Sequence, residues 1–93
     1  MNILITGGTG FLGRHIIEKC IDAGHNIISL SHSEAREKEV QLRYPDVNFY
    51  SLDISHNKDI LDSIIKKHKI EYIIHMHLIV NIKHICISIV YVP

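Results

Sequence analysis

Along the first quarter of the chain, the spacing of apolar and polar side chains changes from that of a buried strand to that of an amphipathic helix. Residues 2–6 form a short, almost continuous apolar run that glycines end, a pattern typical of a strand buried on both faces. Over residues 11–23, apolar side chains recur at helical spacing and charged side chains occupy the other face. Gly24 follows, and glycine is the residue that most often ends a helix in the left-handed conformation. The chain therefore begins with a predicted strand and helix.

The same alternation continues to about residue 76. Further strands are predicted at residues 26–31, 47–52 and 71–76, and further helices at residues 34–44 and 57–68. Ser33 can cap the second helix, and Pro45 ends it. Strands that alternate with helices over short connections form a parallel sheet with right-handed crossovers, so the fold class is α/β.

The last residues have a different composition. No Asp or Glu follows Glu71, and β-branched side chains dominate the segment that follows. Lys83 and His84 interrupt this segment, so no run is long enough for a transmembrane helix and we expect no membrane association. We interpret residues 1–76 as one α/β domain and residues 77–93 as a hydrophobic tail, irregular or β-rich, that favours aggregation.

Composition excludes several classes of function. Lys and Arg total 10, as do Asp and Glu, so the formal net charge is zero and a nucleic-acid partner is not expected. Apolar residues make up 46% and charged residues 22%, which favours a folded chain over a disordered one. Cys20 and Cys86 form no disulfide or zinc pattern, and the start of the chain does not resemble a signal peptide. These features favour a cytoplasmic protein.

Glycine carries the strongest chemical signal, because all five glycines lie within the first 24 residues. Gly8, Gly10 and Gly13 satisfy the pattern Gly-x-Gly-x-x-Gly between a buried strand and an amphipathic helix. Glycines permit positive φ and let backbone N–H groups approach a pyrophosphate, whose charge the helix N-terminus stabilises. The loop is therefore predicted to bind a dinucleotide, and the alternative is a purely structural strand-to-helix turn.

Three segments resemble one enzyme family. They are residues 6–13, Thr-Gly-Gly-Thr-Gly-Phe-Leu-Gly, residues 52–54, Leu-Asp-Ile, and residues 72–75, Tyr-Ile-Ile-His. Over about residues 1–75 the chain resembles the extended short-chain dehydrogenases, the NAD-dependent epimerase/dehydratase family. The resemblance implies a partial Rossmann fold whose four strands lie in the order 3-2-1-4. Residues 31–34 also resemble the nucleotide-sugar dehydratases of polysaccharide biosynthesis.

The resemblance also implies a set of cofactor-binding residues. It places Gly7, Gly10, Phe11 and Leu12 against the pyrophosphate, with Gly13 completing the glycine motif. It places Asp53 and Ile54 beside the adenine. A helix-capping or turn aspartate is the alternative for Asp53.

The second predicted strand ends without the carboxylate that normally binds the ribose 2′-hydroxyl of NAD. Ser31, His32 and Ser33 stand there instead, and Arg36 follows. Hydroxyls, an imidazole and a guanidinium suit a 2′-phosphate, so the sequence favours NADP over NAD. The alternative is that these are cap residues and that Glu34 reaches the ribose.

Residues for catalysis are not found. The family uses Tyr-x-x-x-Lys, and no tyrosine of this chain is followed by lysine four positions later. Met76, where small residues are usual, is expected to press into the space of the cofactor's inner ribose. The spacing of the histidines and cysteines near residues 75–86 matches no zinc motif, so we expect no metal.

We therefore interpret the chain as an NAD(P)-binding N-terminal fragment of a nucleotide-sugar epimerase or dehydratase, inactive by itself. Its partner is the dinucleotide, and a nucleotide sugar is expected only in a full-length relative. The abrupt change near Met76 suggests a truncated or frame-shifted reading frame. The alternatives are a stand-alone nucleotide-binding module and a non-functional remnant, and the oligomeric state stays open.

Overall fold

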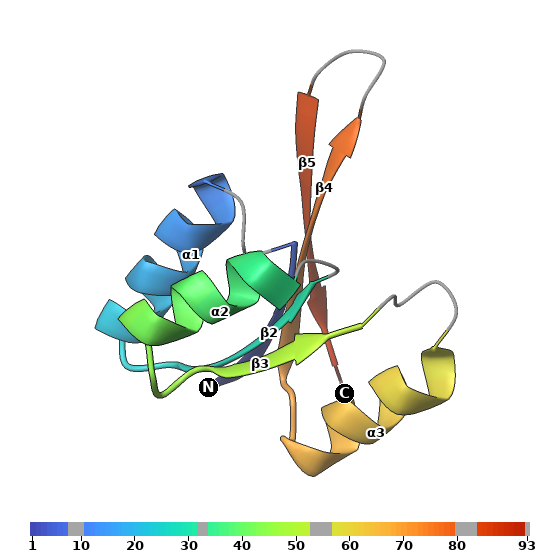
Figure 1. Ribbon diagram of the computed structural model, residues 1–93. Coiled ribbons are helices and arrows are strands. Elements are labelled where there is room, and N and C mark those ends of the chain that lie inside the picture. The colour runs from blue at the N-terminus through green and yellow to red at the C-terminus, as the bar shows by residue number, and fades with distance from the viewer. Residues whose placement is uncertain (8–10, 32–33, 53–56, 80–83, 93) are drawn as a thin grey trace.

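The computed structural model describes residues 1–7, 11–31, 34–52, 57–79 and 84–92. Within these ranges, strands and helices alternate up to residue 79, and the next described element is another strand rather than a helix (Figure 1). The elements in chain order are β1 (Asn2–Thr6), α1 (Phe11–Asp22), β2 (Asn26–Ser31), α2 (Glu34–Arg43), β3 (Asn48–Ser51), α3 (Lys58–Lys67), β4 (Tyr72–Ile79) and β5 (His84–Tyr91). The predicted α/β alternation is confirmed.

All the strands belong to one sheet in the order β3-β2-β1-β4-β5. The first four are parallel, which confirms the predicted order 3-2-1-4 and the partial Rossmann fold. The fifth is antiparallel to β4, with Tyr72 opposite Tyr91 and Ile79 opposite His84. Most of the segment predicted as a tail is therefore a regular strand of the same sheet. β4 also continues beyond its predicted end, because β5 pairs along its whole length.

Two apolar clusters fill the space between the sheet and its helices. The α1-side cluster has as its buried members Ile3, Ile5, Ile17, Ile27, Val47 and Met76. The α3-side cluster has Leu4, Ile28, Leu30, Ile64 and Ile70. Alternate residues of β1 and β2 enter opposite clusters, which explains why these strands read as continuous apolar runs. α2 lies beside α1, to which the Arg14–Glu39 ion pair joins it at 3.1 Å (Figure 1).

The ends of two helices show different backbone solutions. Gly24 has φ +86° after α1, and its N–H donates to the carbonyl of Ile21 at 2.9 Å, which confirms the predicted glycine stop. After α3, Lys69 adopts φ +51° without being glycine, a conformation that the sequence did not predict. The proposed cap Ser33 lies outside the described residues. None of the helices seen within the described ranges has the length and apolarity needed to cross a bilayer.

Candidate functional site

The candidate site lies where β1, β2 and β4 end. Thr6, the last residue of β1, is in register with Leu30 of β2 and with His75 of β4. α1 begins at Phe11, five positions after the last residue of β1, and its N-terminus lies toward the carboxyl ends of the strands (Figure 1). No acidic residue lies in the first turn of α1, so its free N–H groups and positive dipole end face no carboxylate of that turn. The arrangement suits a phosphate group.

Gly7 shapes the start of the turn. Its φ is +74°, and its N–H donates to the carbonyl oxygen of Leu30 at 3.1 Å. A Cβ added at this position would lie 2.5 Å from the carbonyl oxygen of Met76, closer than real Cβ atoms come. Both the backbone angle and the contact with β4 therefore require glycine here. Gly7 therefore lies close against the sheet, as the first glycine of a dinucleotide-binding motif does.

Other residues of the predicted pyrophosphate loop have defined positions. Phe11 and Leu12 form the first residues of α1, and Gly13 is buried in its first turn. A buried glycine there lets a helix approach its strand closely, the third role of the glycine motif. Gly10 lies outside the described residues. The roles of all four residues in binding stay predictions.

The adenosine side of the predicted site depends on β2 and β3. Ser31 is buried at the end of β2, and its carbonyl oxygen accepts a hydrogen bond from the N–H of Leu52 at 2.8 Å. This bond brings the end of β2 next to the residue that precedes Asp53. His32, Asp53 and Ile54 themselves lie outside the described residues, so their proposed contacts with ribose and adenine stay predictions.

A polar pair at this edge was not identified as part of the site from the sequence. The Thr6 hydroxyl and the His75 ring nitrogen Nδ1 are hydrogen-bonded between β1 and β4. The pairing could have been found from the register, since both residues end apolar runs on neighbouring strands. The bond gives a partner to two partly buried polar groups beneath the candidate site, where an unpaired group would cost stability.

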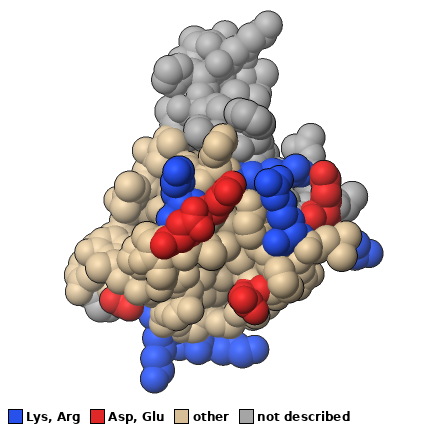
Figure 2. All heavy atoms as spheres, turned by 90° about the vertical axis from the view of Figure 1, so that its left-hand side faces the viewer, with Lys and Arg blue, Asp and Glu red and all other residues tan. Residues whose placement is uncertain are grey.

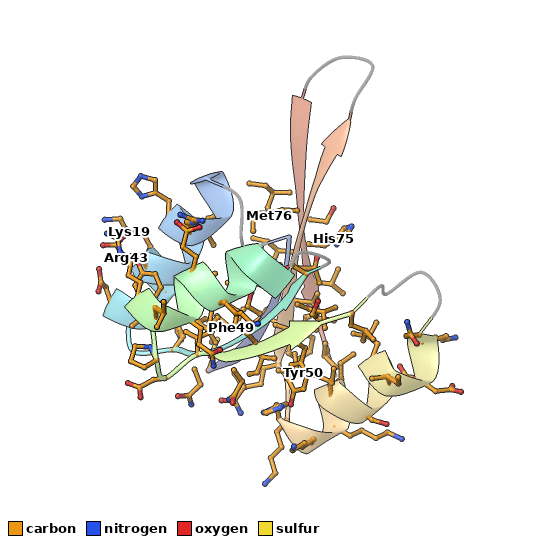
Figure 3. All side chains as sticks on the ribbon, in the orientation of Figure 1. Lys19, Arg43, Phe49, Tyr50, His75 and Met76 are labelled. Atoms are coloured by element: carbon orange, nitrogen blue, oxygen red, sulfur yellow. The ribbon has the colours of Figure 1, made fainter. Side chains whose placement is uncertain are left out.

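Met76 and His75 point to opposite faces of β4, with Met76 toward α1 (Figure 3). Met76 is 7% exposed and belongs to the α1-side cluster. Its backbone carbonyl, rather than the end of its side chain, is the group that closes on Gly7. The expected conflict with the inner ribose of a cofactor stays a prediction.

Other candidate chemistry finds little support in the described residues. Burial raises the pKa of the Cys20 thiol, which packs against the α1-side cluster as a small apolar side chain. No group of three His, Cys, Asp or Glu side chains that could hold a metal lies within the described ranges. On the face shown in Figure 2, acidic and basic side chains are interspersed, without the single-sign patch that nucleic acids select.

Comparisons with known proteins agree with this geometry. The model of the NAD dependent epimerase/dehydratase family matches residues 3–85, so the likeness extends beyond Met76. UDP-glucose 4-epimerase of Bacillus subtilis is 31% identical over 80 residues, which cover 81% of this chain and 23% of that protein.

Solved structures give the same result. UDP-glucose 4-epimerase of Thermotoga maritima, solved with UDP-glucose, is 32% identical with a TM-score of 0.70 over 85% of this chain and 25% of that one. dTDP-glucose 4,6-dehydratase of Bacillus anthracis, solved with NAD, is 26% identical with a TM-score of 0.69 over 84% and 27%. This chain therefore spans about a quarter of the length of these relatives.

Proposed function

Because this chain belongs to the NAD-dependent epimerase/dehydratase family, we propose that it binds the adenosine and pyrophosphate half of a nicotinamide dinucleotide. The observation that carries the proposal is Gly7, whose positive φ and closeness to the Met76 carbonyl require glycine where the chain leaves β1. A glycine in that position lets backbone N–H groups approach a pyrophosphate at a helix N-terminus.

Different residues of the site would contact the pyrophosphate and position α1. Gly7, Gly10, Phe11 and Leu12 would line the pyrophosphate, while Gly13 holds α1 close to the sheet. The absence of acid from the first turn of α1 supports this assignment, because no charge there repels phosphate.

The adenosine would lie farther along the same edge, toward β2 and β3. Asp53 and Ile54 would bind the adenine, and the bond between Ser31 and Leu52 supports placing this pair beside the ribose-binding residues. Ser31 and His32 would take a 2′-phosphate, which favours NADP over NAD.

When bound, the dinucleotide supplies a hydride acceptor or donor. We propose that this chain alone holds that cofactor without turning over a substrate, since no tyrosine is followed by lysine at the fourth position. In a complete protein, it would form the cofactor-binding part of a cytoplasmic nucleotide-sugar epimerase or dehydratase. The named relatives, a UDP-glucose 4-epimerase and a dTDP-glucose 4,6-dehydratase, support that substrate class.

Calorimetric titration with ADP, NAD and NADP tests the proposal. We expect ADP to bind about as well as NAD, with a dissociation constant on the order of millimolar, because the adenine half provides the contacts. NADP should bind more tightly than NAD. Micromolar affinity that depends on the nicotinamide, or turnover of a nucleotide sugar, would overturn the proposal of an adenine half-site. A stand-alone binding module would give the same titration, and an adjoining reading frame with Tyr-x-x-x-Lys would exclude it.

A further inference from the structure

β5 forms one edge of the sheet, and its free side carries unpaired backbone groups. The N–H of Val92 donates to the carbonyl of Glu71 at 2.8 Å. In the β4–β5 register this bond turns the even-numbered residues of β5 toward β4 and the odd-numbered ones outward. No other strand of the described residues lies on that outer side. The N–H and C=O groups of Ile87, Ile89 and Tyr91 therefore point away from the sheet.

The same three residues expose their side chains. Ile87 is 46%, Ile89 67% and Tyr91 63% exposed. Each lies opposite a β4 residue on the α1 side of the sheet, so together they form one apolar row along the edge. Ile89 and Tyr91 lie level with β1, because their β4 partners Ile74 and Tyr72 pair with Ile5 and Ile3. The far ends of β4 and β5 extend beyond the other strands (Figure 1).

The edge lacks the features that usually prevent strands from pairing. Residues 84–92 contain no Lys, Arg, Asp, Glu or Pro, the residues that commonly block an edge. The opposite edge, β3, is only four residues long and so offers little template for pairing. One edge of this sheet is therefore open and long, and the other is short.

We propose that β5 is the docking surface for a second copy of this chain, whose β5 pairs with it antiparallel. A two-fold axis perpendicular to the sheet places outward-pointing residues opposite outward-pointing residues, so both rows of backbone groups are satisfied. A register centred on Ser88 pairs Ile87 with the partner's Ile89 and gives the longest overlap. Since residues 84–92 carry no formal charge, two identical strands meet without like-charge repulsion.

The size of the surface sets the strength of the dimer. With exposed fractions of 46%, 67%, 52% and 63%, Ile87, Ile89, Val90 and Tyr91 offer on the order of 400 Å² of apolar area per copy. A stable interface buries about 800 Å² per partner. The apolar side chains of β5 supply about half of that area, and the paired backbone adds to it. The dimer is therefore weak and depends on concentration. It closes at two copies, because the β5 edge is consumed and β3 is too short to continue the sheet.

Sedimentation velocity of the full chain over a concentration series, from low micromolar to several hundred micromolar, tests the proposal. We expect a reversible change from monomer to dimer. Ile89→Lys should keep the chain monomeric throughout, with an unchanged circular dichroism spectrum because the side chain is already exposed. Leu42→Lys, at a residue of α2 that is 88% exposed, should dimerise like the parent chain. A monomer at every concentration, species larger than a dimer, or a dimer unaffected by Ile89→Lys would overturn the proposal.

A cross-link tests the register. At the centre of the pairing, Ser88 faces the partner's Ser88 in a non-hydrogen-bonded pair, whose Cα separation of about 4.5 Å permits a disulfide. Ser88→Cys should therefore give a covalent dimer on oxidation. Ser63→Cys, on the exposed surface of α3, should not exceed the parent chain in cross-linking. Equal cross-linking by the two variants would contradict a paired β5.

Discussion

Replacing Gly7 by alanine tests the geometry at the start of the candidate loop, and Gly24 provides a matched control. Both glycines have positive φ, +74° and +86°. A Cβ at Gly24 meets nothing within 4 Å, whereas a Cβ at Gly7 meets the Met76 carbonyl oxygen at 2.5 Å. The two substitutions therefore share the backbone strain and differ in the steric clash.

The expected sizes follow from these contacts. An L-residue in the left-handed region costs roughly 1–2 kcal/mol, and lower entropy of the unfolded chain offsets about 0.4–1 kcal/mol of it. Gly24→Ala should therefore lower the free energy of unfolding by about 1 kcal/mol. At Gly7 the clashing atom belongs to the backbone of β4, so the turn must move and the 3.1 Å bond to Leu30 weakens. We expect a total cost for Gly7→Ala of about 3 kcal/mol or more.

Urea unfolding followed by far-ultraviolet circular dichroism measures both values. For a domain of this size the total stability is roughly 5–14 kcal/mol, so a loss of about 3 kcal/mol moves the midpoint clearly. Equal destabilisation by Gly7→Ala and Gly24→Ala would refute the inferred contact between the turn and β4.

Three further substitutions test the core, a helix end and the loop. Ile17→Ala empties a fully buried position of the α1-side cluster and should cost about 2–5 kcal/mol in urea unfolding, against less than about 0.5 kcal/mol for the exposed Leu42→Ala. Lys69→Gly removes the strain of the positive φ after α3 and should raise the free energy of unfolding by up to about 1 kcal/mol, seen as a higher melting temperature. A lower melting temperature would show that this backbone is not strained. Gly10→Val should abolish ADP binding in calorimetry, because a side chain blocks approach to the pyrophosphate, and unchanged affinity would argue against the loop as the site.

The parts of the fold that the sequence predicts are those with a local signal. The run at β1 and the helical spacing of α1 determine each element from its own residues, and the alternation of strands and helices then predicts a parallel sheet. The strand order came from the family resemblance. Gly24 signals its helix end through its own residue type. Lys69 does not, because nothing in its residue type favours positive φ.

Long-range pairing accounts for what the sequence left open. High strand propensity after residue 76 does not say which strand becomes the neighbour or in which direction, so the antiparallel β5 was expected only as an irregular or β-rich tail. Likewise, the family resemblance places Gly7 in the pyrophosphate loop, but its contact with Met76 depends on the packing of β4 against β1.

Titration of the 15N-labelled chain with ADP, followed by amide chemical shifts, tests the proposed dinucleotide site most directly. We expect the largest shifts at Gly7 and Ser31, at the ends of β1 and β2, and at Phe11 and Leu12, at the start of α1. The shifts should saturate in the millimolar range. Amides at the amino ends of the strands, such as those of His25 and Glu71, should stay unchanged. Shifts centred on the amino ends, or none at millimolar ADP, would contradict a nucleotide site at the carboxyl ends of the strands.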